Sequence, residues 1–143
     1  MFRFWRRYMI VLCAISILQG VGSAIAASPD PFGIYSGYLQ SFFWGDAEPS
    51  PAAESFRRFI FAPLGGTLAG YFVLLLFIVV YPFQQRERWA HTAITAGILT
   101  WFFVDSSMTV YHGAWFNLYL VNLPTLALWS APLIFTRRFM DRE

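Results

Sequence analysis

The chain is poor in charge and holds too few metal-binding side chains for a metal or haem site. Only 13% of its 143 residues are charged, whereas a soluble domain has about 25%. Cys13 is the single cysteine, so an intrachain disulfide is excluded. The two histidines, His91 and His112, would lie about 30 Å apart along one helix, too far apart to share a metal or a haem. We therefore predict no metal and no cofactor.

Motifs of common enzymes are also missing. The sequence has no G-x-S-x-G, no H-E-x-x-H and no phosphate-binding loop. The ten basic residues are all arginines and mostly flank apolar runs instead of forming a basic stripe, so nucleic-acid binding is not indicated. We expect no catalysis by this chain alone.

The sequence is rich in hydrophobic residues, which make up 57% of it and occur in long runs. Four apolar spans cover residues 9–27, 59–81, 91–111 and 114–135. Each is close to the roughly 20 residues that a helix needs to cross the hydrocarbon core, and each is too long and continuous for a barrel strand. The sequence predicts an all-α integral membrane four-helix bundle, one transmembrane domain over residues 1–143.

Arginine placement predicts the orientation. With four crossings, eight arginines share one side of the membrane and only Arg57 and Arg58 fall on the other. The positive-inside rule then places both termini in the cytoplasm of an inner (plasma) membrane. The eight are Arg3, Arg6, Arg7, Arg86, Arg88, Arg137, Arg138 and Arg142.

The first span also has a second interpretation. Arg6 and Arg7, a short apolar core and the run from Ala24 to Ala26 are typical of a signal peptide that is cleaved before Ala27. We favour an uncleaved helix, because the apolar stretch continues through Val21 and Ile25.

A short amphipathic helix is predicted at residues 31–44, in the segment between the first and second spans. Asp30–Pro31 is typical of a helix N-cap followed by proline, and Gly45 suits a left-handed C-cap. A second start signal, Ser50–Pro51, precedes the second span. At about a dozen residues the 31–44 helix is too short to cross the membrane. It either lies flat on the outer leaflet or covers the helical bundle as a lid, and both can hold together.

Small residues recur every four positions in the second span, at Ala62, Gly66 and Gly70. Such a stripe lets another helix approach closely, and Gly65 broadens it. The approaching helix is either one of this chain, which is the commoner case, or one of a different protein.

Asp105 is the one carboxylate within the spans, where a charge costs roughly 3 kcal/mol. The third and fourth spans are joined by a tight turn at Gly113, so Asp105 and Asn122 are predicted at nearly equal depth. Pro124 lacks an N–H and leaves the carbonyl of Leu120 without its usual donor. The candidate polar site comprises Asp105, Asn122, Trp101, Trp129, Tyr119 and His112.

This site has two interpretations. It is either a hydrogen-bonded structural contact between helices, for example from Asp105 to Asn122 or Ser106, or a functional site. A functional carboxyl group could carry protons or donate a hydrogen bond to a ligand.

Several segments in the C-terminal two-thirds carry a resemblance, namely 64–70, 81–83, 86–90 and 101–106, with Tyr111, Gly113 and 116–117. In these segments the chain resembles a family of small bacterial four-helix membrane proteins. The resemblance implies the topology and no activity. The four-helix plan is also distantly similar to the sterol-binding EXPERA proteins, but those carry several intramembrane acids where this chain has only Asp105.

Small size, the small-residue stripe and the aromatic-rich surface favour an accessory or assembly subunit of a membrane complex. Its partners would be membrane lipids and other membrane subunits, or a second copy bound through the second helix. The alternatives are a binding protein for a lipid, sterol-like molecule or quinone, and a proton relay through Asp105.

Overall fold

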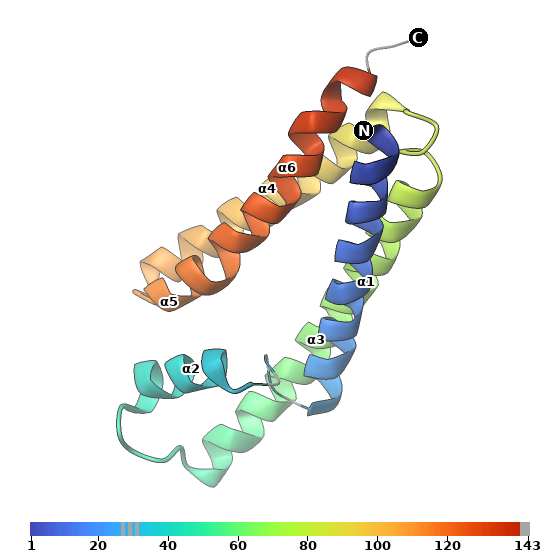
Figure 1. Cartoon of the computed structure of the whole chain (residues 1–143). Helices are drawn as coiled ribbons and strands as arrows, with labels where there is room; N and C mark the ends of the chain where they lie inside the picture. The colour runs from blue at the N-terminus through green and yellow to red at the C-terminus, as the bar shows by residue number, and fades with distance from the viewer. Residues whose placement is uncertain (27, 29, 31, 141–143) are drawn as a thin grey trace. The chain divides into compact units, whose positions relative to one another are not determined.

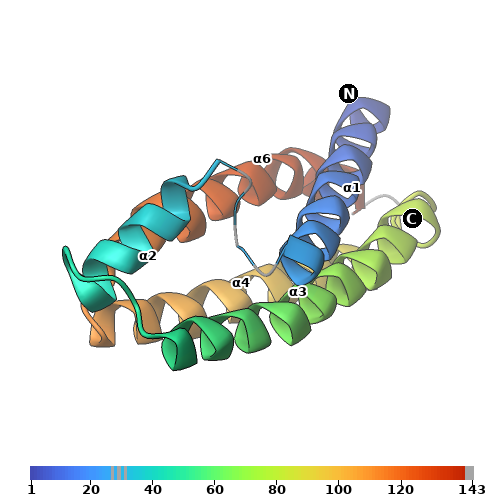
Figure 2. The same ribbon diagram turned by 90° about the horizontal axis from the view of Figure 1, so that it is seen from below.

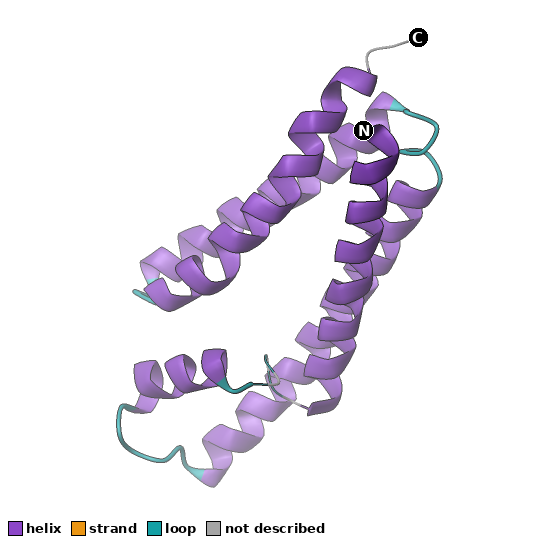
Figure 3. Cartoon of the chain, viewed as in Figure 1, coloured by secondary structure: helices purple, strands orange, loops and turns teal. Residues whose placement is uncertain are grey.

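In the computed structural model, every regular element among the described residues is a helix (Figure 3). The structure describes residues 1–26, 28, 30 and 32–140. Figure 1 traces the helices in chain order. They are α1 (Phe2–Ala26), α2 (Ile34–Trp44), α3 (Pro51–Val80), α4 (Arg88–Tyr111), α5 (Trp115–Asn117), the π-helical turn η1 (Leu118–Asn122) and α6 (Leu123–Met140).

Four helices are long and apolar enough to cross a membrane, which makes the chain a multi-pass membrane protein by length and composition. Between 17% and 22% of the apolar window in each is buried inside the chain. Most of the apolar surface is therefore left to contact lipid or other proteins. The four helices are α1, α3, α4 and the continuous run Trp115–Met140.

The helices extend beyond the predicted spans, and α3 does so most. It begins at Pro51, as the sequence signal predicts, because the Ser50 hydroxyl accepts the backbone N–H of Ala53 at 3.2 Å. With 30 residues, α3 is longer than the roughly 20 that a crossing needs. Its first two turns, which carry Glu54 and Arg57, precede the apolar span.

Helix α2 is present, but it begins at Ile34 and not at residue 31. Pro31 lies outside the described residues. Asp30 still caps the helix, because its Oδ2 accepts the backbone N–H of Tyr35 and its Oδ1 accepts that of Ser36, each at 3.1 Å. Gly33, directly before α2, takes a φ of 72°. The Asp30 side chain therefore caps α2 from four residues before its first residue.

The chain forms two compact units, residues 1–13 with 74–143 and residues 14–73. Helices α1 and α3 contribute residues to both. In the first unit α4 and α6 are antiparallel neighbours joined through a turn at Gly113, whose φ of 73° matches the predicted glycine turn. His91 in α4 hydrogen-bonds the carbonyl of Leu133 in α6 at 2.9 Å.

The second unit contains residues 14–26 of α1, the whole of α2 and residues 51–73 of α3. The α1 segment lies beside α3 (Figure 2). A Cβ built on Gly65 would lie only 2.4 Å from the carbonyl oxygen of Gly20. Glycine at both positions is therefore what lets the two backbones touch.

Candidate functional site

The first candidate site is a polar cluster between α4 and the helical segment that follows the turn. Asn122 donates from Nδ2 to Asp105 Oδ2 at 2.7 Å, so the predicted contact between these two residues is present. Asn117 donates to the same carboxylate oxygen at 3.0 Å and to Thr109 Oγ1 at 2.8 Å. Asp105 Oδ2 therefore sits among several donors, while Asp105 itself is only half-buried.

Asn122 is the most enclosed member of the cluster, with no exposed surface. Its second amide hydrogen donates to Ser106 Oγ at 3.0 Å, and its Oδ1 accepts from Asn117 at 3.4 Å. Both N–H groups and the carbonyl of this side chain thus have partners. A buried amide without them would cost about 1–3 kcal/mol, so these contacts stabilise the pairing of the two helices.

The π-helical turn brings Asn117 and Asn122 together. Residues five apart on a regular α-helix point about 140° away from each other. In η1 the backbone N–H of Leu123 donates to the carbonyl of Leu118, five residues earlier, and this wider turn places both asparagines on the side facing Asp105. Single π turns of this kind occur frequently at functional sites.

The site predicted from the sequence did not include Asn117, whose spacing from Asn122 does not match one α-helical face. Pro124 was the available signal. A proline lacks the N–H that would bond four residues back, so it favours an altered turn immediately before it.

The two oxygens of Asp105 are in different surroundings. Oδ2 takes the hydrogen bonds of the cluster, whereas Oδ1 makes none with the described residues. Oδ1 is therefore left to accept a hydrogen bond from a further donor.

The remaining predicted site residues differ in how deeply they are buried. Trp129 is buried with 2% exposure and Trp101 is half-buried, while Tyr119 and His112 are exposed. Trp101, Tyr119 and His112 make no hydrogen bond to the cluster residues that the structure describes. Over the same part of the chain, no three His, Cys, Asp or Glu side chains gather as metal ligands.

The predicted small-residue stripe of Ala62, Gly66 and Gly70 faces open space within its unit. A Cβ built on Gly66 or Gly70 meets no other atom within 4 Å, and Ala62 is exposed. The intrachain contact uses the adjacent face instead, through Gly65. The small-residue face that the sequence singled out is therefore uncovered in this unit.

A second candidate site, missed by sequence reasoning, is a cavity of about 350 Å³ in the second unit. It lies between the 28–33 segment, α2 and the first turns of α3. The polar positions of α2 look solvent-facing in the sequence, but Ser36 and Gln40 line this cavity together with Trp44. The cluster of Asp30, Glu54 and Arg57 in the long outer segment was the signal that could have indicated it.

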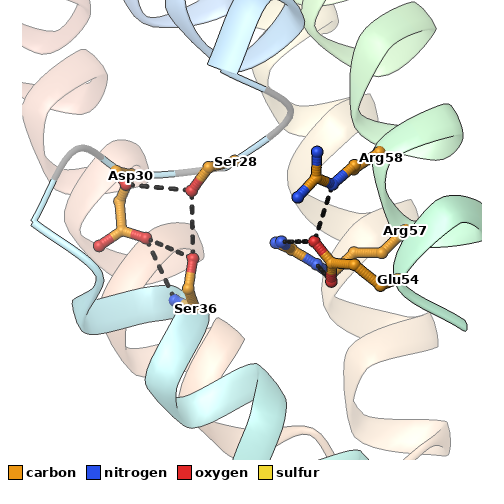
Figure 4. A network of polar contacts seen from close by, with 6 residues as sticks. All are labelled: Ser28, Asp30, Ser36, Glu54, Arg57 and Arg58. Atoms are coloured by element: carbon orange, nitrogen blue, oxygen red, sulfur yellow. Dashed lines mark hydrogen bonds and ion pairs between the residues drawn. The ribbon is translucent and has the colours of Figure 1, made fainter. Parts of the chain in front are cut away.

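The cavity has the Asp30 carboxylate on one wall and the Arg57–Glu54 ion pair on the other (Figure 4). On one wall the Asp30 carboxylate accepts the hydroxyl of Ser36 at 3.0 Å, and Ser36 Oγ lies 3.3 Å from Ser28 Oγ. On the other, Arg57 forms a two-point contact with Glu54 through Nε and Nη2, both at 2.8 Å. Arg58, which does not line the cavity, also bonds Glu54 at 2.9 Å, so this acid is shared by two arginines.

Asp30 is held in its charged form. Partial burial raises the pKa of this carboxyl group, but hydrogen bonds from the backbone N–H and hydroxyl of Ser36 and from the backbone N–H groups of Tyr35 and Ile34 outweigh burial and lower the pKa below its usual range. The wall that carries Asp30 therefore stays negative at neutral pH.

Comparison of the chain with models of protein families, with curated proteins and with solved structures gave no match. The resemblance to small bacterial four-helix membrane proteins stays a prediction.

Proposed function

We propose that the chain is an accessory or assembly subunit of a larger membrane protein complex and has no catalysis of its own. In this proposal its four long helices form a bundle in an inner membrane, with both termini in the cytoplasm and α2 at the outer surface. A transmembrane helix of another protein packs along the face formed by Ala62, Gly66 and Gly70.

The observation that carries the proposal is the contrast between two faces of α3. The face through Gly65 contacts α1 at backbone distance, whereas no atom of the unit comes within 4 Å of a Cβ on Gly66 or Gly70. Lipid tails gain little from a groove of small residues, but a helix gains close van der Waals contact. The uncovered face is thus suited to a second helix.

The polar cluster supports a structural part in this function. Asn122 is fully satisfied inside the chain, which is what a fixed helix hairpin requires. The cluster stiffens the hairpin of α4 and α6 so that it presents a constant surface to a partner.

A second function is favoured by one observation, the unused Oδ1 of Asp105 on a half-buried side chain. This oxygen could hydrogen-bond a hydrophobic ligand with a polar end, such as a sterol-like molecule or a quinone, or pass a proton. Asp105→Asn keeps the size of the side chain and should then abolish ligand retention or proton movement.

The test of the leading proposal uses the full chain in its native membrane. A photo-crosslinking residue at position 62 should yield one stoichiometric product, and Gly66→Leu or Gly70→Leu should reduce that product at least roughly tenfold by pushing the backbones apart. Gly22→Leu is the matched control, because a Cβ on Gly22 also meets nothing within 4 Å but lies on α1.

Mass spectrometry of the product separates the outcomes. A different membrane protein supports the proposal, and a product of twice the chain mass means self-association through α3. Cross-links to lipid alone, or a product equally reduced by Gly22→Leu, would show that this face does not bind a partner helix.

A further inference from the structure

The cavity of the second unit has the size and charge pattern of a site for a small molecule with a positive and a negative end. Its volume of about 350 Å³ lies within the range of ligand pockets, about 300–1,000 Å³. Asp30 and Arg57 both line it, from opposite walls. We propose that it binds the headgroup of a zwitterionic phospholipid, a phosphate followed by an ammonium group, as in phosphatidylethanolamine.

Arg57 suits the phosphate. Glu54 takes its Nε and Nη2, which fixes the guanidinium plane and leaves Nη1 without a bond to any described residue. The side chain lines the cavity and is 24% exposed. The N–H groups of Nη1 remain as donors, and hydrogen bonds from a guanidinium group to phosphate oxygens are charge-assisted.

Asp30 suits the ammonium group. Its carboxylate is held in place by the N-terminus of α2, and its pKa leaves it negative, so it offers an attractive charge that needs no reorganisation. The Trp44 indole also lines the cavity, and aromatic faces attract organic cations. The hydroxyl of Ser28 and the amide oxygen of Gln40 add acceptors for the ammonium hydrogens.

A lipid fits better than a soluble molecule that carries the same two charges. On α2 an apolar stripe is exposed, with Ile34 at 61%, Tyr38 at 53% and Phe42 at 41%. On α3 the exposed side chains of Phe59 (70%) and Ile60 (42%) follow the arginines directly. A headgroup in the cavity would therefore have apolar surface on both flanking helices for its acyl chains.

An anionic lipid such as phosphatidylglycerol fits less well. It would satisfy Arg57, but it brings no cation for Asp30 and would place its own negative charge near the carboxylate. The site should therefore discriminate by the presence of the ammonium group, and not by phosphate alone.

The test uses the full chain, purified in non-ionic detergent and stripped of lipid. The protein is incubated with equal amounts of phosphatidylethanolamine and phosphatidylglycerol of identical acyl chains, and the retained lipid is counted by native mass spectrometry. We expect at least roughly tenfold preference for phosphatidylethanolamine. Arg57→Gln should remove most retention of both lipids, and Asp30→Asn should remove the preference.

Two further variants keep the result interpretable. Arg58→Gln is the matched control, because Arg58 pairs with the same glutamate and does not line the cavity; it should retain the lipid like the parent chain. Since Asp30 also caps α2, Gln40→Trp fills the cavity without touching the cap, and it should lower retention while the circular dichroism of the protein is unchanged.

Three outcomes would overturn the proposal. The first is equal retention of the two lipids by the unmodified protein. The second is that Gln40→Trp retains as much lipid as the parent chain. The third is that soluble phosphoethanolamine binds as tightly as the lipid, which would mean that the ligand is a soluble molecule.

Discussion

The Asn122 side chain is fully buried, and both its amide nitrogen and its amide oxygen have hydrogen-bond partners. Its main acceptor, Asp105, is only half-buried. Removing either residue leaves a polar group of the other without its best partner, and an unsatisfied buried polar group is costly. The energetic role of the pair is therefore testable by removing its members one at a time and together.

We expect Asp105→Leu and Asn122→Leu each to lower the free energy of unfolding by about 1–3 kcal/mol. The double variant should be milder than the sum of the two, because the two groups that depend on each other leave together. Unfolding in mixed detergent micelles, followed by circular dichroism, measures the three values.

Ser107→Ala is a suitable control, since the Ser107 hydroxyl bonds only the carbonyl of Phe103 in its own helix. Its effect should be within about 0.5 kcal/mol. Simple additivity of the Asp105 and Asn122 changes would contradict an energetic coupling between these side chains.

At the scale of single elements, α3 carries small residues on two adjacent faces, of which one contacts α1 and the other is open. The Gly65 face lets α1 approach until a Cβ would overlap the Gly20 carbonyl, while Gly66 lies in open space. Gly65 therefore has no room for a side chain, whereas the neighbouring Gly66 does.

Gly65→Ala should destabilise the isolated protein by about 1–3 kcal/mol, because α1 and α3 must move apart to admit the methyl group. Gly66→Ala should be neutral or slightly stabilising, since alanine is the better helix former by up to about 1 kcal/mol. The pair differs by one position and one methyl group, so thermal unfolding in detergent compares the two directly. Equal losses from both changes would argue against the close contact at Gly20.

At the scale of the whole molecule, the asymmetry of the arginines is the feature from which we predict the orientation of the chain. Only Arg57 and Arg58 lie between the first and second spans, against eight in the segments assigned to the other side. Arg57 and Arg58 share one acid, Glu54, so even this outer pair is partly neutralised. The remaining arginines favour the cytoplasmic side.

A reporter fused after Glu143 should therefore be cytoplasmic, and one inserted at Pro49 should be external. Activity of a reporter enzyme that folds on only one side of the membrane, measured in both fusions, decides this. An external C-terminus would contradict the four-crossing orientation. N-terminal sequencing of the mature chain is the companion measurement, because a start at Ala27 would mean that the first span is a cleaved signal peptide.

The sequence by itself determined the four long apolar helices, the start of α3 at Ser50–Pro51 and the glycine turn at Gly113. These features depend on residues that are near each other in the chain, through helix length, N-cap chemistry and allowed φ angles. The Asp105–Asn122 contact was also accessible, because a tight hairpin fixes relative depth by counting residues. Helix length, N-caps and glycine turns depend on local chemistry, so a single sequence is enough to predict them.

Tertiary structure alone decided which glycine makes the helix contact, that Asn117 joins the polar cluster, and that a charged cavity forms beside α2. Periodicity shows that small residues share a face, but the partner helix determines which face is covered, and here α1 covers Gly65 and not Gly66. Asn117 reaches the polar cluster through the π turn, whose spacing departs from the α-helical period. The cavity is formed by three segments, so it depends on where their backbones meet and not on any spacing along the chain.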